Sequence, residues 1–131
     1  MNCPKCEATM EQVTVGQYTI DRCTGCGGLW FDLREHEHIA TEAKADVARV
    51  DTGDPARGRQ NDQRRDISCP ACHVQMLKMS VHGQPHIHYE SCPVCHGAYF
   101  DAGEFADYAK LTLVDQAKRF FGGFRRRSAK A

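Results

Sequence analysis

The eight cysteines carry the clearest chemistry in this 131-residue chain, because they form four Cys-x-x-Cys pairs. Sixteen residues separate the first two pairs and nineteen separate the last two, and both spacings match the C-x2-C-x15–20-C-x2-C pattern of four-cysteine zinc sites. Four thiolates close a tetrahedron around one ion, so the sequence predicts two structural Zn(2+) ions per chain. The predicted ligands are Cys3, Cys6, Cys23 and Cys26 for the first ion, and Cys69, Cys72, Cys92 and Cys95 for the second.

Redox chemistry and catalysis are the less favoured interpretations of the same pairs. A Cys-x-x-Cys pair can act as a redox dithiol, but four pairs at this spacing leave no cysteine over as a nucleophile. A catalytic zinc needs an open coordination position, which four sulfurs close. The same ligand set suits iron in a rubredoxin-like site, and such a protein would be coloured. We therefore predict no catalytic residue and no enzyme.

A longer stretch around the second pair of each set occurs twice. Residues 23–35 and 92–104 share two cysteines, a glycine, an aromatic pair, an aspartate and a glutamate in the same order. The carboxylates Asp32/Glu35 and Asp101/Glu104 could form acid–base pairs. However, Asp-x-x-Glu before an apolar-periodic segment is also typical of a helix N-cap. We favour capping in both copies.

Each set of cysteines encloses the pattern of a β-hairpin and precedes that of a helix. Around a Gly16-Gln17 turn, and again around a longer turn in the second copy, apolar residues alternate with polar ones and are expected to face inward. These residues are Val13, Val15, Tyr18 and Ile20, then Leu77, Met79, Val81, Ile87 and Tyr89. Helices are predicted from about Leu33 to Val50 and from about Ala102 to Phe121. The second is apolar on more than one side, which predicts a further contact with the first unit, or contact with a protein partner or self-association through helix 102–121.

The histidines are expected to bind no metal. His36 and His38 do not share a face of the predicted helix, so we expect both in solvent. His73 and His96 follow cysteine pairs and are expected in tight turns, at positions like that of Gly27. The open face of the second hairpin carries His82, His86 and His88. An auxiliary metal or pH-sensitive site there is the alternative to a plain polar face, which we favour because no carboxylate or cysteine joins them.

Composition divides the chain into four segments: 1–50, 51–66, 67–118 and 119–131. Residues 51–66 hold four arginines and four aspartates with a single alanine as the apolar residue, which predicts a flexible charged linker. The last segment is a basic aromatic tail that could contact nucleic acid, an anionic membrane surface or an acidic protein, or simply aid solubility. Its cations are Arg119, Arg125, Arg126, Arg127 and Lys130.

The motif Cys-Pro-x-Cys, a hairpin, then Cys-x-x-Cys-Gly-Gly-x-Trp-x-Asp-x-x-Glu resembles the transcription factor IIB-type zinc-finger family of small bacterial proteins. The resemblance covers two tandem copies, from Cys3 to about Ala40 and from Cys69 to about Ala109. The second copy departs from the motif at His96 and Tyr99. The resemblance implies zinc at all eight cysteines and suggests a transcription-related role.

Charge and hydropathy then bound the function. Seventeen basic residues balance seventeen acidic ones, and bound thiolates add negative charge, so the chain lacks the footprint of a strong general nucleic-acid binder. No apolar run approaches the roughly 18 residues of a membrane span, and Cys3 leaves no room for a signal peptide, which predicts a cytoplasmic protein. The predicted fold is a small metal-dominated α+β protein of two zinc ribbons, each followed by a helix. The predicted function is a non-enzymatic binding or adaptor module, with nucleic-acid binding through residues 119–131 as the alternative.

Overall fold

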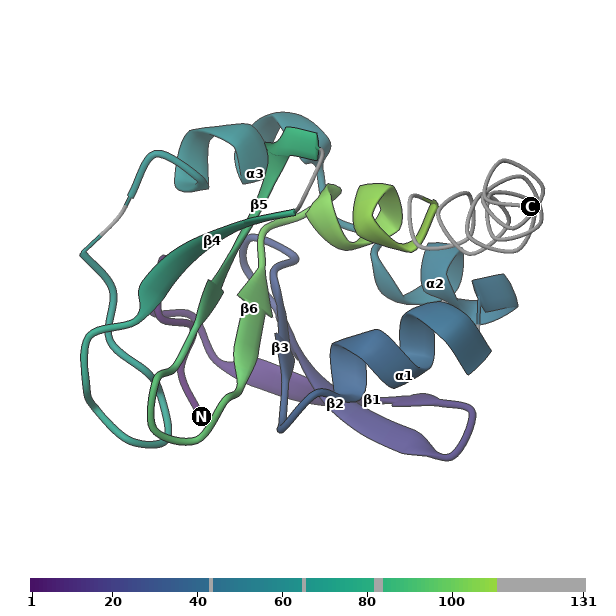
Figure 1. The fold of residues 1–131 in the computed structure, drawn as a ribbon, viewed down its shortest axis with the longest axis horizontal. Helices are drawn as coiled ribbons and strands as arrows, with labels where there is room; N and C mark the ends of the chain where they lie inside the picture. The colour runs from purple at the N-terminus through teal and green to yellow at the C-terminus, as the bar shows by residue number, and fades with distance from the viewer. Residues whose placement is uncertain (43, 65, 82–83, 111–131) are drawn as a thin grey trace, which may run out of the picture.

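A computed structural model describes residues 1–42, 44–64, 66–81 and 84–110 of the chain (Figure 1). Its strands are β1 (Met10–Val15), β2 (Tyr18–Cys23), β3 (Leu29–Phe31), β4 (Leu77–Val81), β5 (Gln84–Ser91) and β6 (Ala98–Phe100). Its helices are α1 (Glu35–Glu42), α2 (Lys44–Val50) and α3 (Pro55–Asn61), and residues 104–110 are also helical. Each cysteine set thus holds a β-hairpin that is followed by a helix, as the predicted α+β fold of two ribbons requires.

The two ribbons join in one antiparallel sheet. The strand order is β1-β2-β3-β6-β5-β4 (Figure 1). The three strands of the first ribbon are thus followed by the three strands of the second ribbon in reverse order. At the joint β3 pairs with β6, and Trp30 lies opposite Tyr99, the residue at the same place in the second copy. Corresponding strands that pair antiparallel at corresponding residues give the chain an approximate internal twofold symmetry.

The central strands are buried on both faces because side chains of a strand point alternately to its two sides. Phe31 and Phe100 point to one face, where they pack with Ile39 of α1 and Phe105 of the last described helix. Trp30 and Tyr99 belong to a second apolar cluster, which contains cysteines of both sets. One face of the sheet therefore carries α1, α2 and the helical residues 104–110, and the other face carries both cysteine sets.

The described helices lie within the predicted ranges. In the helix expected from Leu33 to Val50, α1 and α2 lie on either side of residue 43, which is outside the described residues. The helix expected from Ala102 to Phe121 is seen over residues 104–110, where Phe105 and Ala109 are buried in the core of the chain itself. Its predicted continuation and the tail 119–131 lie outside the described residues. No helix among the described residues is long and apolar enough to cross a membrane.

The prediction of a flexible linker at residues 51–66 is wrong for α3, which occupies Pro55–Asn61. Asp54 caps this helix by accepting a hydrogen bond from the backbone N–H of Ala56 at 3.0 Å. Gly58 lies so close to the second ribbon that an added Cβ would come within 2.0 Å of the carbonyl oxygen of Ala102. The segment has no apolar side chain larger than alanine to bury, and close backbone packing and polar contacts hold it instead. The division of the chain at residues 50, 66 and 118 stays a prediction.

The second hairpin also differs from its predicted pattern. Leu77 and Met79 were expected to face inward, but they are 53% and 38% exposed. They lie on β4, an edge strand that neither apolar cluster of buried residues reaches. In the first hairpin the predicted pattern holds for Val15 and Ile20, which are buried.

Candidate metal centres

The sulfur atoms of each cysteine set converge on one point. In both sets the four Sγ atoms lie within 4.8 Å of one another. The Sγ atoms of Cys3 and Cys26 are 3.8 Å apart and those of Cys69 and Cys95 are 3.7 Å apart. A tetrahedral ion with metal–sulfur bonds of about 2.3 Å requires sulfur–sulfur distances of about 3.8 Å. The two four-cysteine groups therefore fit one ion each in size and in donor chemistry.

Tight turns in the backbone bring these sulfurs together. After the first pair of each set, Glu7 and His73 adopt the left-handed conformation, with φ of 68° and 62°. After the second pair, Gly27 and His96 do the same, with φ of 78° and 60°. His96 thus occupies a tight-turn position equivalent to that of Gly27, as predicted, whereas His73 corresponds to Glu7.

Backbone amides point at sulfurs of both sets. The N–H groups of Gly25 and Cys26 lie 3.3 Å from the Sγ of Cys23. In the second set, the N–H groups of Val94 and Cys95 lie 3.4 Å from the Sγ of Cys92. Such hydrogen bonds favour the charged thiolate, which is the form that binds metal.

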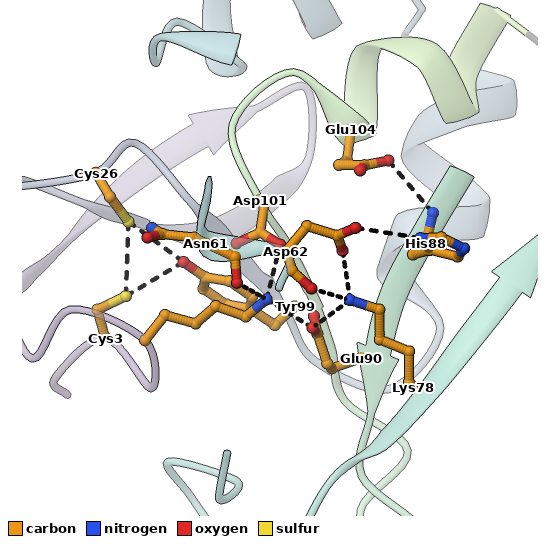
Figure 2. Close-up of polar contacts among 11 residues, drawn as sticks. Cys3, Cys26, Asn61, Asp62, Lys78, His88, Glu90, Tyr99, Asp101 and Glu104 are labelled. Carbon is orange, nitrogen blue, oxygen red and sulfur yellow. Dashed lines mark hydrogen bonds and ion pairs between the residues drawn. The ribbon is translucent and has the colours of Figure 1, made fainter. Parts of the chain in front are cut away.

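The first set also receives a contact from the other ribbon. The hydroxyl oxygen of Tyr99 lies 3.2 Å from the Sγ of Cys3 and 3.4 Å from that of Cys26 (Figure 2). The hydrogen bond between the two sulfurs raises the pKa of Cys3 and lowers that of Cys26 to about 4. This contact favours the thiolate form of Cys26.

A buried ion cluster joins the ribbons beside this contact. The Nζ of Lys5, which lies between Cys3 and Cys6 in the sequence, is 2.6 Å from Glu90 and 2.7 Å from Asp101 of the second ribbon. Lys5 is fully buried, and the two carboxylates are each 1% exposed. Lys5 also donates to the backbone carbonyl of Asn61 at the end of α3, over 2.9 Å. Burial alone would lower the pKa of Lys5, but the charges of Asp101 and Glu90 outweigh it and raise that pKa.

The cluster continues toward the second hairpin through Asp62, the residue after α3. Asp62 accepts hydrogen bonds from Lys78 and lies 3.2 Å from the Nδ1 of His88 (Figure 2). Although burial raises its pKa, these two partners outweigh that effect and lower the pKa of Asp62. The carboxylates of Asp62, Glu90 and Asp101 lie within 4.8 Å of one another, but the ammonium groups of Lys5 and Lys78 already pair with them and offset two of the three negative charges. This cluster is therefore an ion-pair network rather than a third metal site.

The predicted helix caps form only in part. Glu35 accepts a hydrogen bond from the backbone N–H of Asp32 at 3.0 Å, as a capping box requires. The side chain of Asp32 instead accepts from the indole N–H of Trp30 at 3.2 Å. In the second copy the prediction is wrong: Asp101 binds Lys5, and Glu104 accepts from the backbone N–H of His88. Burial raises the pKa of both Asp101 and Glu104 to about 7.

The histidines also differ from the prediction. His36 is not in solvent but 6% exposed, and its ring lies 5.5 to 6.2 Å from those of Phe31, Tyr89, Phe100 and Tyr108. Its burial lowers the pKa of His36 to about 4. His88 contacts Asp62, so a carboxylate does join this histidine. His82 and the side chain of His86 lie outside the described residues.

Lys5 and Glu90 were missed by the sequence analysis because neither belongs to the repeated motif. The signal that could have found Lys5 is the difference between the knuckles Cys-Pro-Lys-Cys and Cys-Pro-Ala-Cys, where a lysine in one copy replaces an alanine in the other. A charge that only one copy carries indicates a contact that only that copy makes.

Comparison with known proteins finds one family model. The transcription factor zinc-finger family matches residues 2–42 and 68–110, which together span more than half of the chain. Neither the curated proteins nor the solved structures contain a match. The two matched regions coincide with the two ribbons.

Proposed function

The chain belongs to the transcription factor zinc-finger family, and from this premise we propose that it is a non-enzymatic, cytoplasmic binding or adaptor module that holds two structural zinc ions. The proposed ligands are the two cysteine sets. For the first ion these are Cys3, Cys6, Cys23 and Cys26, and for the second Cys69, Cys72, Cys92 and Cys95.

One observation carries the proposal: each set supplies four converging sulfurs. A zinc ion with four protein sulfurs has no position left for water or substrate, so it acts on folding and not on a reaction. Zinc would supply a positive centre to the buried thiolates, and the backbone amides beside Cys23 and Cys92 would stabilise the remaining negative charge. The proposal includes a transcription-related role, which the family name alone suggests.

Metal analysis of the purified protein tests this assignment. We expect two zinc ions per chain and a colourless protein, whereas iron in the same ligands would give colour. One ion per chain, or none in a protein that remains folded, would contradict the proposal. Serine in place of both Cys69 and Cys72 should reduce the zinc content by one, whereas Glu7→Gln, a change outside the ligands, should leave it at two.

The partner is proposed to be a protein. Leu77 and Met79 leave apolar surface exposed on edge strand β4, and an edge strand presents unpaired backbone groups as well. Phe105 and Ala109 are buried inside the chain, so these two residues are not available for contact or self-association through helix 102–121.

Nucleic acid is the alternative partner, through Arg119, Arg125, Arg126, Arg127 and Lys130. Binding of the full chain to generic DNA and RNA should be measured at low and moderate salt, beside a chain that ends at residue 118. Salt-sensitive binding that requires residues 119–131 would favour nucleic acid. Equally negligible binding by both chains would rule out the nucleic-acid alternative and favour a protein partner.

A further inference from the structure

We propose that Tyr99, a residue of the second ribbon, completes the first metal centre by donating a hydrogen bond to its sulfur ligands, and that metal binding at the first centre therefore depends on the docked second ribbon. This inference rests on the proposed metal binding by Cys3, Cys6, Cys23 and Cys26.

The position of the Tyr99 hydroxyl is set by close packing. The ring is fully buried, and its oxygen lies 3.2 Å from Cys3 and 3.4 Å from Cys26 (Figure 2). A Cβ added to Gly28 would come within 1.8 Å of this oxygen, so only glycine at that position leaves room for it. The pairing of Trp30 with Tyr99 across β3 and β6 fixes the backbone from which the ring extends.

The chemistry assigns the direction of the hydrogen bond. A metal-bound thiolate has no proton and can only accept, so the phenol must be the donor. Cys3 and Cys26 are 2% and 4% exposed, and four thiolates leave the site with a net charge of about −2 around a divalent ion. A buried negative charge that lacks water needs donors from the protein. The single proton of Tyr99 can serve either sulfur, or both at once.

The second centre is built differently, which makes the effect specific to the first. Its symmetry-related aromatic residue is Trp30, whose ring lies against Gly97. The indole N–H of Trp30 is directed to Asp32 and not to a sulfur. Cys69 and Cys92 accept from backbone amides of their own ribbon, as Cys23 does in the first centre. Both centres thus take donors from backbone amides of their own ribbon, and among the described residues the first centre has one further donor, the Tyr99 hydroxyl, from the other ribbon.

Thermodynamic linkage follows from this arrangement. Metal in the second centre stabilises the second ribbon and so holds Tyr99 in place, which raises the affinity of the first centre. The coupling is reciprocal, because each metal must change the affinity of the other site by the same factor.

Tyr99→Phe tests the proposal because it removes the hydroxyl and keeps the ring. With the second centre loaded, we expect the zinc affinity of the first centre to fall about 10-fold, the low end of the effect of lost contacts to metal ligands. Chelator competition, with the ¹³Cβ shifts of Cys26 and Cys95 to identify the site that releases its metal, measures this change. Tyr89→Phe is the matched control, since it removes a hydroxyl from the same ribbon on the helix-covered face.

A spectroscopic measurement separates the hydrogen bond from a general loss of stability. In the cobalt(II)-substituted protein, loss of a donor to sulfur should shift the sulfur-to-metal charge-transfer band of the first centre to lower energy in Tyr99→Phe but not in Tyr89→Phe. An unchanged band and affinity in Tyr99→Phe, or an equal change in both variants, would overturn the proposal. A wild-type protein that binds no metal would instead overturn the proposed function.

Discussion

The two ribbons share their cysteines, their tight turns and their hairpins, but they differ in the first knuckle, where one copy has Lys5 and the other Ala71. Lys5 reaches across the joint to Glu90 and Asp101. The positions that correspond to these carboxylates in the first ribbon are Asp21 and Asp32. There Asp32 is exposed and binds Trp30, and no lysine stands at position 71 to face the pair.

Other differences between the copies also lie where the ribbons meet. Trp30 corresponds to Tyr99, and His36 corresponds to Phe105 in the shared aromatic core. The charged segment 51–64, which occurs once, supplies Asn61 and Asp62 to one side of the joint only. The two copies therefore have the same metal ligands, whereas the positions at which they carry different residues are those that hold the two ribbons together.

Removal of both metals should have the largest effect, because structural zinc contributes about 10–16 kcal/mol per site in small zinc-binding domains. The shared sheet and the cluster that contains cysteines of both sets predict one cooperative transition rather than two. Far-UV circular dichroism during chelator titration measures it. Two separate steps with equal amplitude would show instead that the ribbons fold independently.

Lys5→Met should be the most destabilising change at the joint, because it leaves Glu90 and Asp101 buried without their cation. Loss of one partner from a buried ion pair costs about 3–5 kcal/mol, and urea denaturation of the zinc-loaded protein measures the loss. Ala71→Lys is the matched substitution in the other knuckle, where residue 71 is exposed, and it should change stability by less than about 0.5 kcal/mol. Similar losses in both variants would contradict the asymmetry of the joint.

Gly28→Ala and Gly97→Ala test the aromatic side chain that each ribbon packs against a glycine of the other. A Cβ on Gly28 would lie 1.8 Å from the hydroxyl oxygen of Tyr99, and one on Gly97 would lie 2.3 Å from the ring of Trp30. Overpacking of this kind costs about 1–3 kcal/mol. Only Gly28→Ala should also weaken metal binding at the first centre, since it displaces the Tyr99 hydroxyl. Chelator competition on both variants measures the difference, and an equal loss of metal affinity would contradict it.

The sequence was sufficient to predict the ribbons, because ligand spacing and hairpin alternation are local signals that cysteine chemistry makes specific. Val15 and Ile20 are buried as predicted, and the cysteines converge as their spacing indicates. The joint could not be predicted in the same way. Its pairing of β3 with β6 joins residues about 70 positions apart, and nothing in either copy alone reveals the partner strand.

The errors have one physical cause, which is that neither composition nor local periodicity shows which distant segments a residue will contact. Residues 51–66 hold no apolar side chain larger than alanine, yet α3 is fixed by Gly58 and by contacts to lysines of both ribbons. Asp101 has the sequence context of a helix cap, but its carboxylate pairs with Lys5 of the other ribbon instead. Leu77 and Met79 have the alternation of a buried strand but lie on a sheet edge, away from both clusters of buried apolar residues.

His36→Phe should have the smallest effect on stability. It tests the last difference between the two copies, because Phe105 occupies the corresponding position in the second ribbon. Burial among aromatic rings lowers the pKa of His36 to about 4, below the value of about 6.5 in an unfolded chain. A lowered pKa means that the neutral ring stabilises the fold above pH 6.5 and that this stability is lost as the pH falls toward 4. Between about pH 7.5 and pH 6 the wild type should therefore lose about 1 kcal/mol that His36→Phe retains. Urea denaturation of the zinc-loaded protein at both pH values measures this, and His38→Phe, an exposed neighbour, should behave like the wild type. Equal pH dependence in His36→Phe and the wild type would show that folding does not shift the pKa of His36, and would contradict its burial among the aromatic rings.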